Sequence, residues 1–308
     1  MAIARDIALL GLLLSAVAGG GCAGLVRPSR PATPHALSAR PTLEDVVTLV
    51  NDNSSRVRSL YSTDASLHIP LLPALRVNLA YERPRRLRLR AETGVTGPEV
   101  DLGSNDALFW AWVRRMEPPT TFYCRHEQFS ASPLRQFLPI EPDWLIEALG
   151  VNGIDPSWHT SGPFPVRRGR LELRSVLDRP DGPLTKVTVV DSAGGWILEQ
   201  HLYDGRGTRL ASSMTSAQWR DPASGAVVPR RIEIQWPTTG MSARLDLRTL
   251  EVNHLGGDPA LLFELPDYPG SAVVDMADPS FRPPLAAPAP PPPAAPVAER
   301  PRRFRLFR

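Results

Sequence analysis

The chain has 308 residues, a hydrophobic content of 42% and a formal net charge of +3 at pH 7. The apolar content is ordinary and predicts a packed core, large enough for one domain or two smaller ones. A charge this small for the length argues against a nucleic-acid partner.

Residues 1–21 have the features of a bacterial lipoprotein signal peptide. Arg5 precedes a short apolar stretch, and three glycines then lead into Cys22. The stretch is too short to cross a bilayer as a stable helix, and small residues mark a cleavage site. We therefore expect Cys22 to become the lipidated N-terminus, carrying palmitate or a similar acyl chain. Gly19 stands where a lipobox usually has leucine, so a secretory signal followed by a chance cysteine is the alternative.

Residues 22–41 are rich in Pro, Ala, Arg and Ser, and this composition predicts a flexible tether. Thr42 and Asp45 then form a capping-box pattern, and apolar residues recur at helical spacing as far as Leu60. The pattern predicts an amphipathic helix over about residues 42–60.

Alternating apolar residues follow over about 75–82 and 86–91, and each run predicts a strand with one apolar face. The run 107–113 is apolar on both faces. Further strands are predicted at about 121–126, 169–177, 184–191, 196–203, 208–219, 228–236 and 242–252. Close turns between short strands favour one curved antiparallel sheet or barrel. A short helix is predicted within 141–150, between Pro142 and Gly150.

Cys124 falls in an alternating segment and has no disulfide partner once Cys22 is lipidated. We expect it to be buried and inert, because a reactive cysteine needs an electropositive, accessible setting. A reactive thiol is the alternative.

Residues 276–308 differ in kind from the rest. Prolines interleaved with alanine predict a disordered, extended spacer, and the tip 300–308 carries arginines among Phe304, Leu306 and Phe307. This tip suits contact with an anionic surface such as a membrane, and a solvated end is the alternative.

The sequence shows no recognised catalytic constellation. His126-Glu127 lacks the second histidine of a helical zinc site, and the other histidines are scattered. No nucleophile elbow, Walker loop or dinucleotide fingerprint occurs. We therefore predict no catalytic residue, no metal and no cofactor, and hence no enzyme. A hydrolase without a known motif stays a minor alternative.

The order of elements resembles the LolA/LolB type of periplasmic lipoprotein carrier and receptor. The pieces that match are the opening helix, the Arg-Pro step within 81–89, the aromatic strand within 105–112, the helix within 142–150 and the closing segment 262–266. The resemblance implies a mainly β fold, α+β in class: a curved antiparallel half-open β-barrel with an N-terminal helix and a short helical lid. It implies one lipid-binding domain over residues 42–275.

The resemblance also implies roles for particular residues. Arg83 matches the arginine that holds the lid shut, although an Arg-Pro step also simply ends strands. Leu71 and Leu72 stand where the lipid-anchored receptor has an apolar loop that inserts into the membrane. An acyl cavity is expected to be lined by six residues: Leu79, Tyr81, Leu89, Trp110, Trp112 and Trp144. The same side chains would serve equally in a filled core.

Together these features predict a lipid-anchored envelope protein that binds lipid or the acyl chains of lipoproteins, as a chaperone in their transport or insertion. Ala23 is not the aspartate associated with inner-membrane retention, so we expect the periplasmic face of the outer membrane. The alternative is a non-catalytic sensor or scaffold module of the same fold.

Overall fold

The computed structural model describes residues 37–94, 97–136, 142–167, 169–179 and 182–282. The predicted signal peptide, Cys22, most of the predicted tether and nearly all of the predicted tail therefore lie outside the described residues. The chain divides into two compact units. Unit 1 comprises the described residues up to Val57 together with Gly150–Pro229, and unit 2 comprises Arg58–Leu149 and the described residues from Arg230 onward.

Unit 1 is built on helix α2 (Leu43–Ser55). Thr42 caps it: its hydroxyl accepts from the Asp45 amide, and the Asp45 carboxylate accepts from the Thr42 amide. Val46 and Val50, one helical turn apart, are buried against sheet residues Leu171, Leu173, Val190 and Ile197. The helix ends at Ser55 instead of the predicted 60, because the chain then turns and Leu60 already belongs to a strand.

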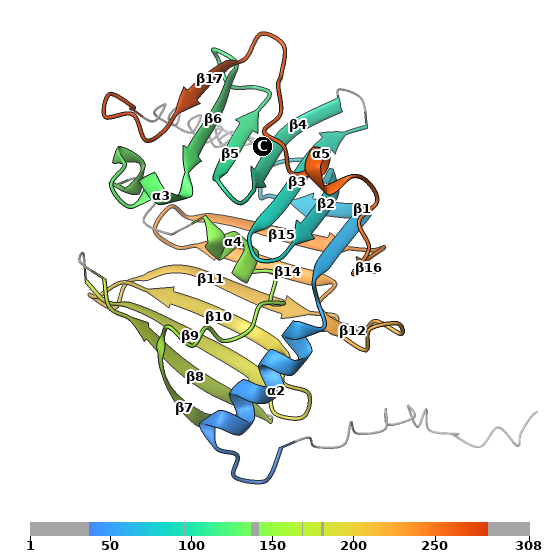
Figure 1. The fold of residues 1–308 in the computed structure, drawn as a ribbon, viewed down its shortest axis with the longest axis vertical. Helices are drawn as coiled ribbons and strands as arrows, with labels where there is room; N and C mark the ends of the chain where they lie inside the picture. Colours follow the sequence, from blue (N-terminus) through green and yellow to red (C-terminus); the bar gives the residue numbers. More distant parts are fainter. Residues whose placement is uncertain (1–36, 95–96, 137–141, 168, 180–181, 283–308) are drawn as a thin grey trace, which may run out of the picture. The chain divides into compact units, whose positions relative to one another are not determined.

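The sheet of unit 1 is antiparallel and has the order β11-β10-β9-β8-β7. Its strands are β7 (His159–Val166), β8 (Arg170–Leu177), β9 (Leu184–Asp191), β10 (Ile197–Tyr203) and β11 (Arg209–Ser216). A separate two-stranded pair is formed by β12 (Trp219–Arg220) and β13 (Val227–Val228). Figure 1 shows α2 lying along the larger sheet, which places the core of this unit between helix and sheet.

The sheet of unit 2 runs in the order β17-β6-β5-β4-β3-β2-β1-β15-β14, with β16 also on β1. Its strands are β1 (Ser59–His68), β2 (Leu75–Glu82), β3 (Arg86–Thr93), β4 (Gly97–Ser104), β5 (Leu108–Val113), β6 (Thr120–Arg125), β14 (Arg231–Trp236), β15 (Met241–Leu247), β16 (Glu251–Val252) and β17 (Ala272–Asp275). β17 pairs with β6 in parallel. Among the described residues, the other strand pairs of this sheet are antiparallel.

Unit 2 carries only short helices. They are α3 (His126–Phe129), the 3-10 turn η1 (Pro133–Gln136), α4 (Asp143–Glu147) and α5 (Pro259–Leu262). The helix predicted within 141–150 is α4, and it is shorter than expected. Across the described ranges, no helix is both long and apolar enough to span a membrane.

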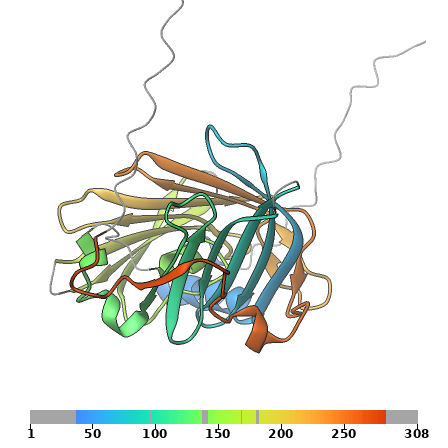
Figure 2. The same ribbon diagram turned by 90° about the horizontal axis from the view of Figure 1, so that it is seen from above.

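The predicted fold class is confirmed: the protein is mainly β, its sheets are mostly antiparallel, and the strand path is open and does not close on itself. Bulges in the β1–β2 and β3–β4 pairs interrupt the register, and such bulges bend strands and increase their twist. In Figure 2 the strands of unit 2 fan out from one another, as expected for a strongly twisted sheet.

The register of unit 2 divides its side chains between two faces. One row of residues paired across strands β2 to β5 consists of Leu79, Leu89, Leu102 and Ala111. These side chains share one face of the sheet, which we call the cavity face. The next row contains Ala80, Arg88, Gly103 and Trp110 and belongs to the opposite face. We call it the strap face, because the segment 262–271, the strap, is held on it.

Gly103 gives a sharp test of this packing. A Cβ atom at Gly103 would lie 2.0 Å from the indole ring of Trp110, whereas one at Gly94 would meet nothing within 4 Å. Because Trp110 is buried, we expect Gly103→Ala to lower the free energy of unfolding by about 1–3 kcal/mol and Gly94→Ala to change it little. Denaturant titration of both variants measures this. Equal stability of the two would contradict the placement of Trp110.

Candidate functional site

Unit 2 contains a largely apolar cavity of about 470 Å³. Small-molecule sites typically occupy about 300–1,000 Å³ and are lined by apolar side chains with few polar groups. The lining residues from the sheet are Leu87, Leu102, Gly103, Ser104, Phe109, Trp110 and Ala111. The lid segment, which is η1 and α4 with Pro142, provides Leu134, Pro142, Trp144, Leu145 and Ile146. The β14–β15 hairpin provides Trp236, Thr238, Thr239 and Met241, and Met276 follows β17. Leu102 and Ala111 are only half-buried, so part of the cavity face has no side chains packed over it.

Helix α4 lies over this cavity as the predicted lid. Trp144 is 4% exposed and packs edge-to-face on Trp236, with 6.3 Å between ring centroids. Trp144 and Ile146 are the buried residues of the helix. A five-residue helix has almost no stability by itself, so packing of these apolar side chains must hold it in place.

Two basic side chains of the unit contact the first residue of the lid. Arg85 Nη2 lies 3.2 Å from Asp143 Oδ2, and His126 Nδ1 lies 3.9 Å from Asp143 Oδ1. Arg85 and Asp143 are 37% and 35% exposed, and exposed pairs of this kind contribute about 0–1 kcal/mol. Such a contact positions the lid without preventing it from opening.

Arg83, which the sequence resemblance assigns to the latch, lies in the β2–β3 turn. Its guanidinium hydrogen-bonds to the Tyr81 hydroxyl, and its amide donates to the Arg58 carbonyl. The ion pair from this turn to α4 comes from Arg85, two residues further along. Sequence reasoning missed Arg85, because the turn Arg83-Pro84-Arg85-Arg86 offers three arginines and nothing in the pattern tells which one points to the lid.

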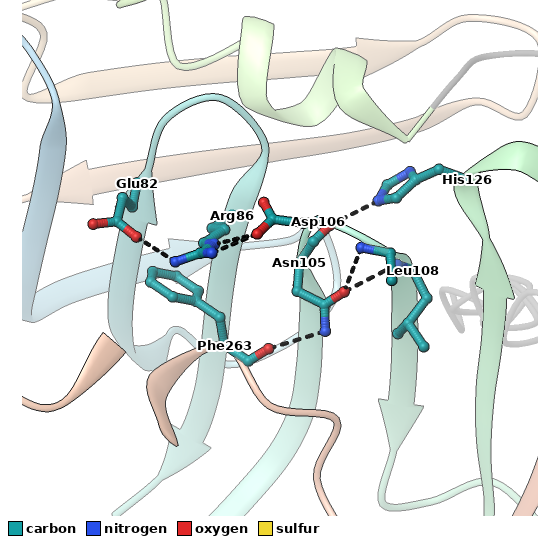
Figure 3. A network of polar contacts seen from close by, with 8 residues as sticks. Glu82, Arg86, Asn105, Asp106, Leu108, His126 and Phe263 are labelled. Carbon is teal, nitrogen blue, oxygen red and sulfur yellow. Dashed lines mark hydrogen bonds and ion pairs between the residues drawn. The ribbon is translucent and has the colours of Figure 1, made fainter. Parts of the chain in front are cut away.

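A polar network holds the β4–β5 turn beside the cavity (Figure 3). The Asn105 side chain accepts from the Ala107 and Leu108 amides and donates to the Phe263 carbonyl at 3.2 Å. Arg86 bridges Asp106 and Glu82 across the neighbouring strand ends. The network fixes the turn and therefore the position of Ser104, which ends β4 at the cavity wall.

Ser104, His126 and Asp143 form a chain of contacts beside the cavity. His126 Nε2 is 3.2 Å from Ser104 Oγ and 3.0 Å from the Asn105 carbonyl oxygen. A carbonyl oxygen only accepts, so in the tautomer that bonds to it Nε2 carries the hydrogen and has no lone pair for the serine proton. Within the described ranges, no group of three or more His, Cys, Asp and Glu residues is placed to hold a metal ion.

The six predicted cavity residues divide between the two faces. Leu79, Tyr81 and Leu89 lie on the cavity face, but none of the three lines the cavity: the first two are buried in the sheet and Leu89 is half-buried. Trp144 lines the cavity from the lid.

Trp110 and Trp112 belong to the strap face, so Trp110 borders the cavity through its strand backbone while its indole lies on the other side. The Trp110 indole N–H points to Asp101 at 3.3 Å. Trp112 stacks on Tyr268 with 3.9 Å between ring centroids and donates to Ser271 Oγ.

The strap is the segment 262–271, and Asp101 holds it on the sheet. The Asp101 side chain is fully buried, accepts from both Arg88 Nε and Nη2, and accepts from the Tyr268 hydroxyl at 2.7 Å. Arg88 also donates to the Leu262 carbonyl. A buried carboxylate needs such partners, because unpaired burial would be very costly.

Leu71 and Leu72 occupy the tip of the β1–β2 hairpin. Their side chains are 103% and 55% exposed, and Leu71 has a φ of +68°. A leucine with positive φ is strained by about 1–3 kcal/mol, and no burial of its side chain compensates for this here. The geometry presents an apolar side chain to the surroundings.

Cys124 is buried, as predicted. Burial raises the pKa of its thiol to about 11, which keeps it protonated at neutral pH. Its neighbours Phe109, Phe129 and Leu134 form a small apolar cluster beside the lid segment.

Unit 1 has a hollow of about 610 Å³ on its sheet. Charged side chains line this hollow, and two pairs of them are in contact: Arg170 with Glu199 at 2.5 Å and Arg174 with Glu172 at 2.7 Å. The cavity under α4 is therefore the stronger candidate for an apolar ligand.

No family model matches the chain, and no curated protein matches its sequence. Among solved structures it is similar to a DUF1329 family protein from Desulfovibrio piger, with 12% identity, a TM-score of 0.49, and coverage of 71% of this chain and 96% of that one. It is also similar to a provisionally assigned outer membrane lipoprotein-sorting domain from Vibrio parahaemolyticus, with 10% identity, a TM-score of 0.48, and coverage of 70% and 94%.

A third similar structure is the LolA superfamily protein NE2245 from Nitrosomonas europaea, with 11% identity, a TM-score of 0.45, and coverage of 70% of this chain and 96% of that one. At this identity the likeness concerns the fold alone and does not tell what this chain binds.

The contact between Tyr268 and Asp101 predicts a pH dependence. Burial, and then the hydrogen bond to Asp101, raise the pKa of Tyr268 from 10.0 to about 12. Below pH 10 both folded and unfolded chains keep this proton. Above it the unfolded chain releases the proton first, so stability falls between about pH 10 and 12.

Tyr268→Phe should remove part of this fall in the free energy of unfolding at alkaline pH. The rest should remain, because burial also raises the pKa of Tyr81 to about 12. At neutral pH the variant should lose about 1–3 kcal/mol, because Asp101 loses a donor. Urea unfolding at about pH 9 and about pH 11 measures both effects. Tyr203→Phe in unit 1 is the control, and an identical alkaline slope in both variants would contradict the strap assignment.

Proposed function

We propose that this protein binds lipid, or the acyl chains of lipoproteins, in the cavity under α4 and takes part in their transport or insertion at the outer membrane. The observation that carries the proposal is the apolar cavity of about 470 Å³ between the cavity face of unit 2 and its short helix. We assign it a carrier or receptor role without a catalytic step.

The energetics of burial favour such cargo. Each methylene that moves from water into an apolar site contributes about 0.8 kcal/mol, so a chain can be held without any charged partner. The bilayer interior is as apolar as the cavity, so an acyl chain can pass from one to the other. For this transfer the cavity must open. The exposed Arg85–Asp143 contact is weak enough to open, and we assign the latch role to Arg85.

We further propose that lipidated Cys22 anchors the protein at the periplasmic face of the outer membrane and that Leu71 and Leu72 contact the bilayer. His68, at the end of β1, pairs with Arg244 near the start of β15. The β1–β2 tip therefore lies at the same end of the strands as the β14–β15 hairpin. Thr239 and Met241 of that hairpin border the cavity. Cargo leaving there would meet the membrane that the leucines touch.

The cavity can be blocked without removing a core residue. Ala111 is half-buried on the cavity face, so Ala111→Phe fills the space that cargo would occupy. Purified Cys22→Ser protein should carry co-purified acyl species detectable by mass spectrometry and should bind a fluorescent fatty acid. The Ala111→Phe variant should lose at least about tenfold in affinity, as expected when several methylenes lose their site.

Ala107→Phe makes the same exchange at an exposed turn residue outside the cavity and should bind normally. Clean protein that binds no acyl probe would refute the carrier proposal and favour a sensor or scaffold module.

The latch assignment is tested by release kinetics. Arg85→Gln removes the ion pair to Asp143 and should speed release of a bound fluorescent fatty acid about two- to fivefold, in line with the small energy of an exposed pair. Arg83→Gln is the matched variant from the same turn and should change the rate less. Faster release from the Arg83 variant than from the Arg85 variant would return the latch to Arg83. Stopped-flow transfer to acceptor vesicles gives both rates.

A further inference from the structure

One residue that lines the cavity carries a buried polar atom that packing alone does not explain. In the described part of the chain, Trp144 is the cavity-lining residue whose buried polar side-chain atom has no hydrogen-bond partner. That atom is Nε1 of the indole, and the side chain is 4% exposed. An indole N–H is a donor only, so it requires an acceptor oxygen.

Leaving such a donor without an acceptor is costly. A buried N–H without a partner costs about 1–3 kcal/mol, and a buried tryptophan normally finds one. The hydroxyl groups that line the cavity do not provide this acceptor. Ser104 contacts His126, and the exposed Thr239 donates to the Trp236 carbonyl.

We propose that Trp144 Nε1–H donates a hydrogen bond to the carbonyl oxygen at the head of an acyl chain, so that the cavity selects acyl esters and amides over plain hydrocarbons. The inference rests on the proposed lipid-binding function and names its ligand chemistry. The aliphatic chain lies against Leu87, Leu102 and Ala111, and its carbonyl faces the lid.

This placement also couples recognition to closure. Trp144 follows Asp143, the residue that Arg85 and His126 contact. A carbonyl bound to Trp144 therefore stabilises the same short helix that the ion pairs hold. Cargo with a carbonyl favours the closed lid, and a hydrocarbon of equal length fills the cavity without that contact.

The test compares two probes on the Cys22→Ser chain: a fatty-acid methyl ester and an alkane of matched length, each competing with a fluorescent fatty acid. Trp144→Phe keeps an aromatic ring against Trp236 but removes the N–H. We expect its affinity for the ester to fall about three- to tenfold, the worth of one hydrogen bond, while its affinity for the alkane changes little.

Trp236→Phe is the matched control, because it makes the same change of shape at the facing ring and should affect both probes alike. If Trp144→Phe fails to fold, benzothienylalanine at position 144 keeps the indole shape and replaces the N–H by sulfur. An unchanged ester-to-alkane ratio in either Trp144 variant would overturn the inference. Wild-type protein that binds neither probe would overturn the proposed function itself, and the inference with it.

The carbonyl can come from a membrane phospholipid or from the lipidated N-terminus of a lipoprotein. Competition by phosphatidylglycerol and by a synthetic diacyl lipopeptide separates these sources. Whichever competes should lose affinity in Trp144→Phe, and a competitor that binds this variant as tightly as wild type would contradict the proposed contact.

Discussion

The Asp101 carboxylate organises the strap face of unit 2. It has no exposed surface, and its oxygens accept from the forked guanidinium of Arg88, the indole of Trp110 and the hydroxyl of Tyr268. Burying a charge is tolerable only with partners of this kind. Because these partners draw the strap onto one side of the sheet, the buried ion pair of Asp101 and Arg88 lies on that side. The cavity lies on the other side.

Much of this fold follows from local pattern. The capping box at Thr42 and the alternation in β2, β3, β8, β9 and β10 appear in the structure close to where they are predicted. Strands β1, β4 and β7 are absent from the prediction for a physical reason. β1 is interrupted by polar residues and a bulge, β4 contains Asp101 among its buried residues, and β7 carries two prolines. Each is strand-like only because a neighbour supplies its hydrogen bonds.

The candidate site shows the same limit. Alternation correctly puts Leu79 and Leu89 on one face, but a run that is apolar on both faces cannot tell which side each tryptophan takes. Trp110 lies over Gly103 on the strap face, and that pairing depends on register across β4, a strand the pattern does not reveal. Likewise, the unpartnered N–H of Trp144 depends on how α4 lies over the sheet. Sequence indicates which residue types are present, and tertiary packing decides which direction they face.

The strand order also has a consequence for biogenesis. β1 pairs with β15, and the strap residues Tyr268 and Ser271 come long after Trp112, which they contact. While the ribosome is still making the second half of the chain, β1 has β2 beside it but lacks β15, and Trp112 lacks the strap residues that contact it. The nascent N-terminal half therefore has an unpaired strand edge and exposed apolar surface. A holding factor that shields it until the last strands emerge would spare it from aggregation.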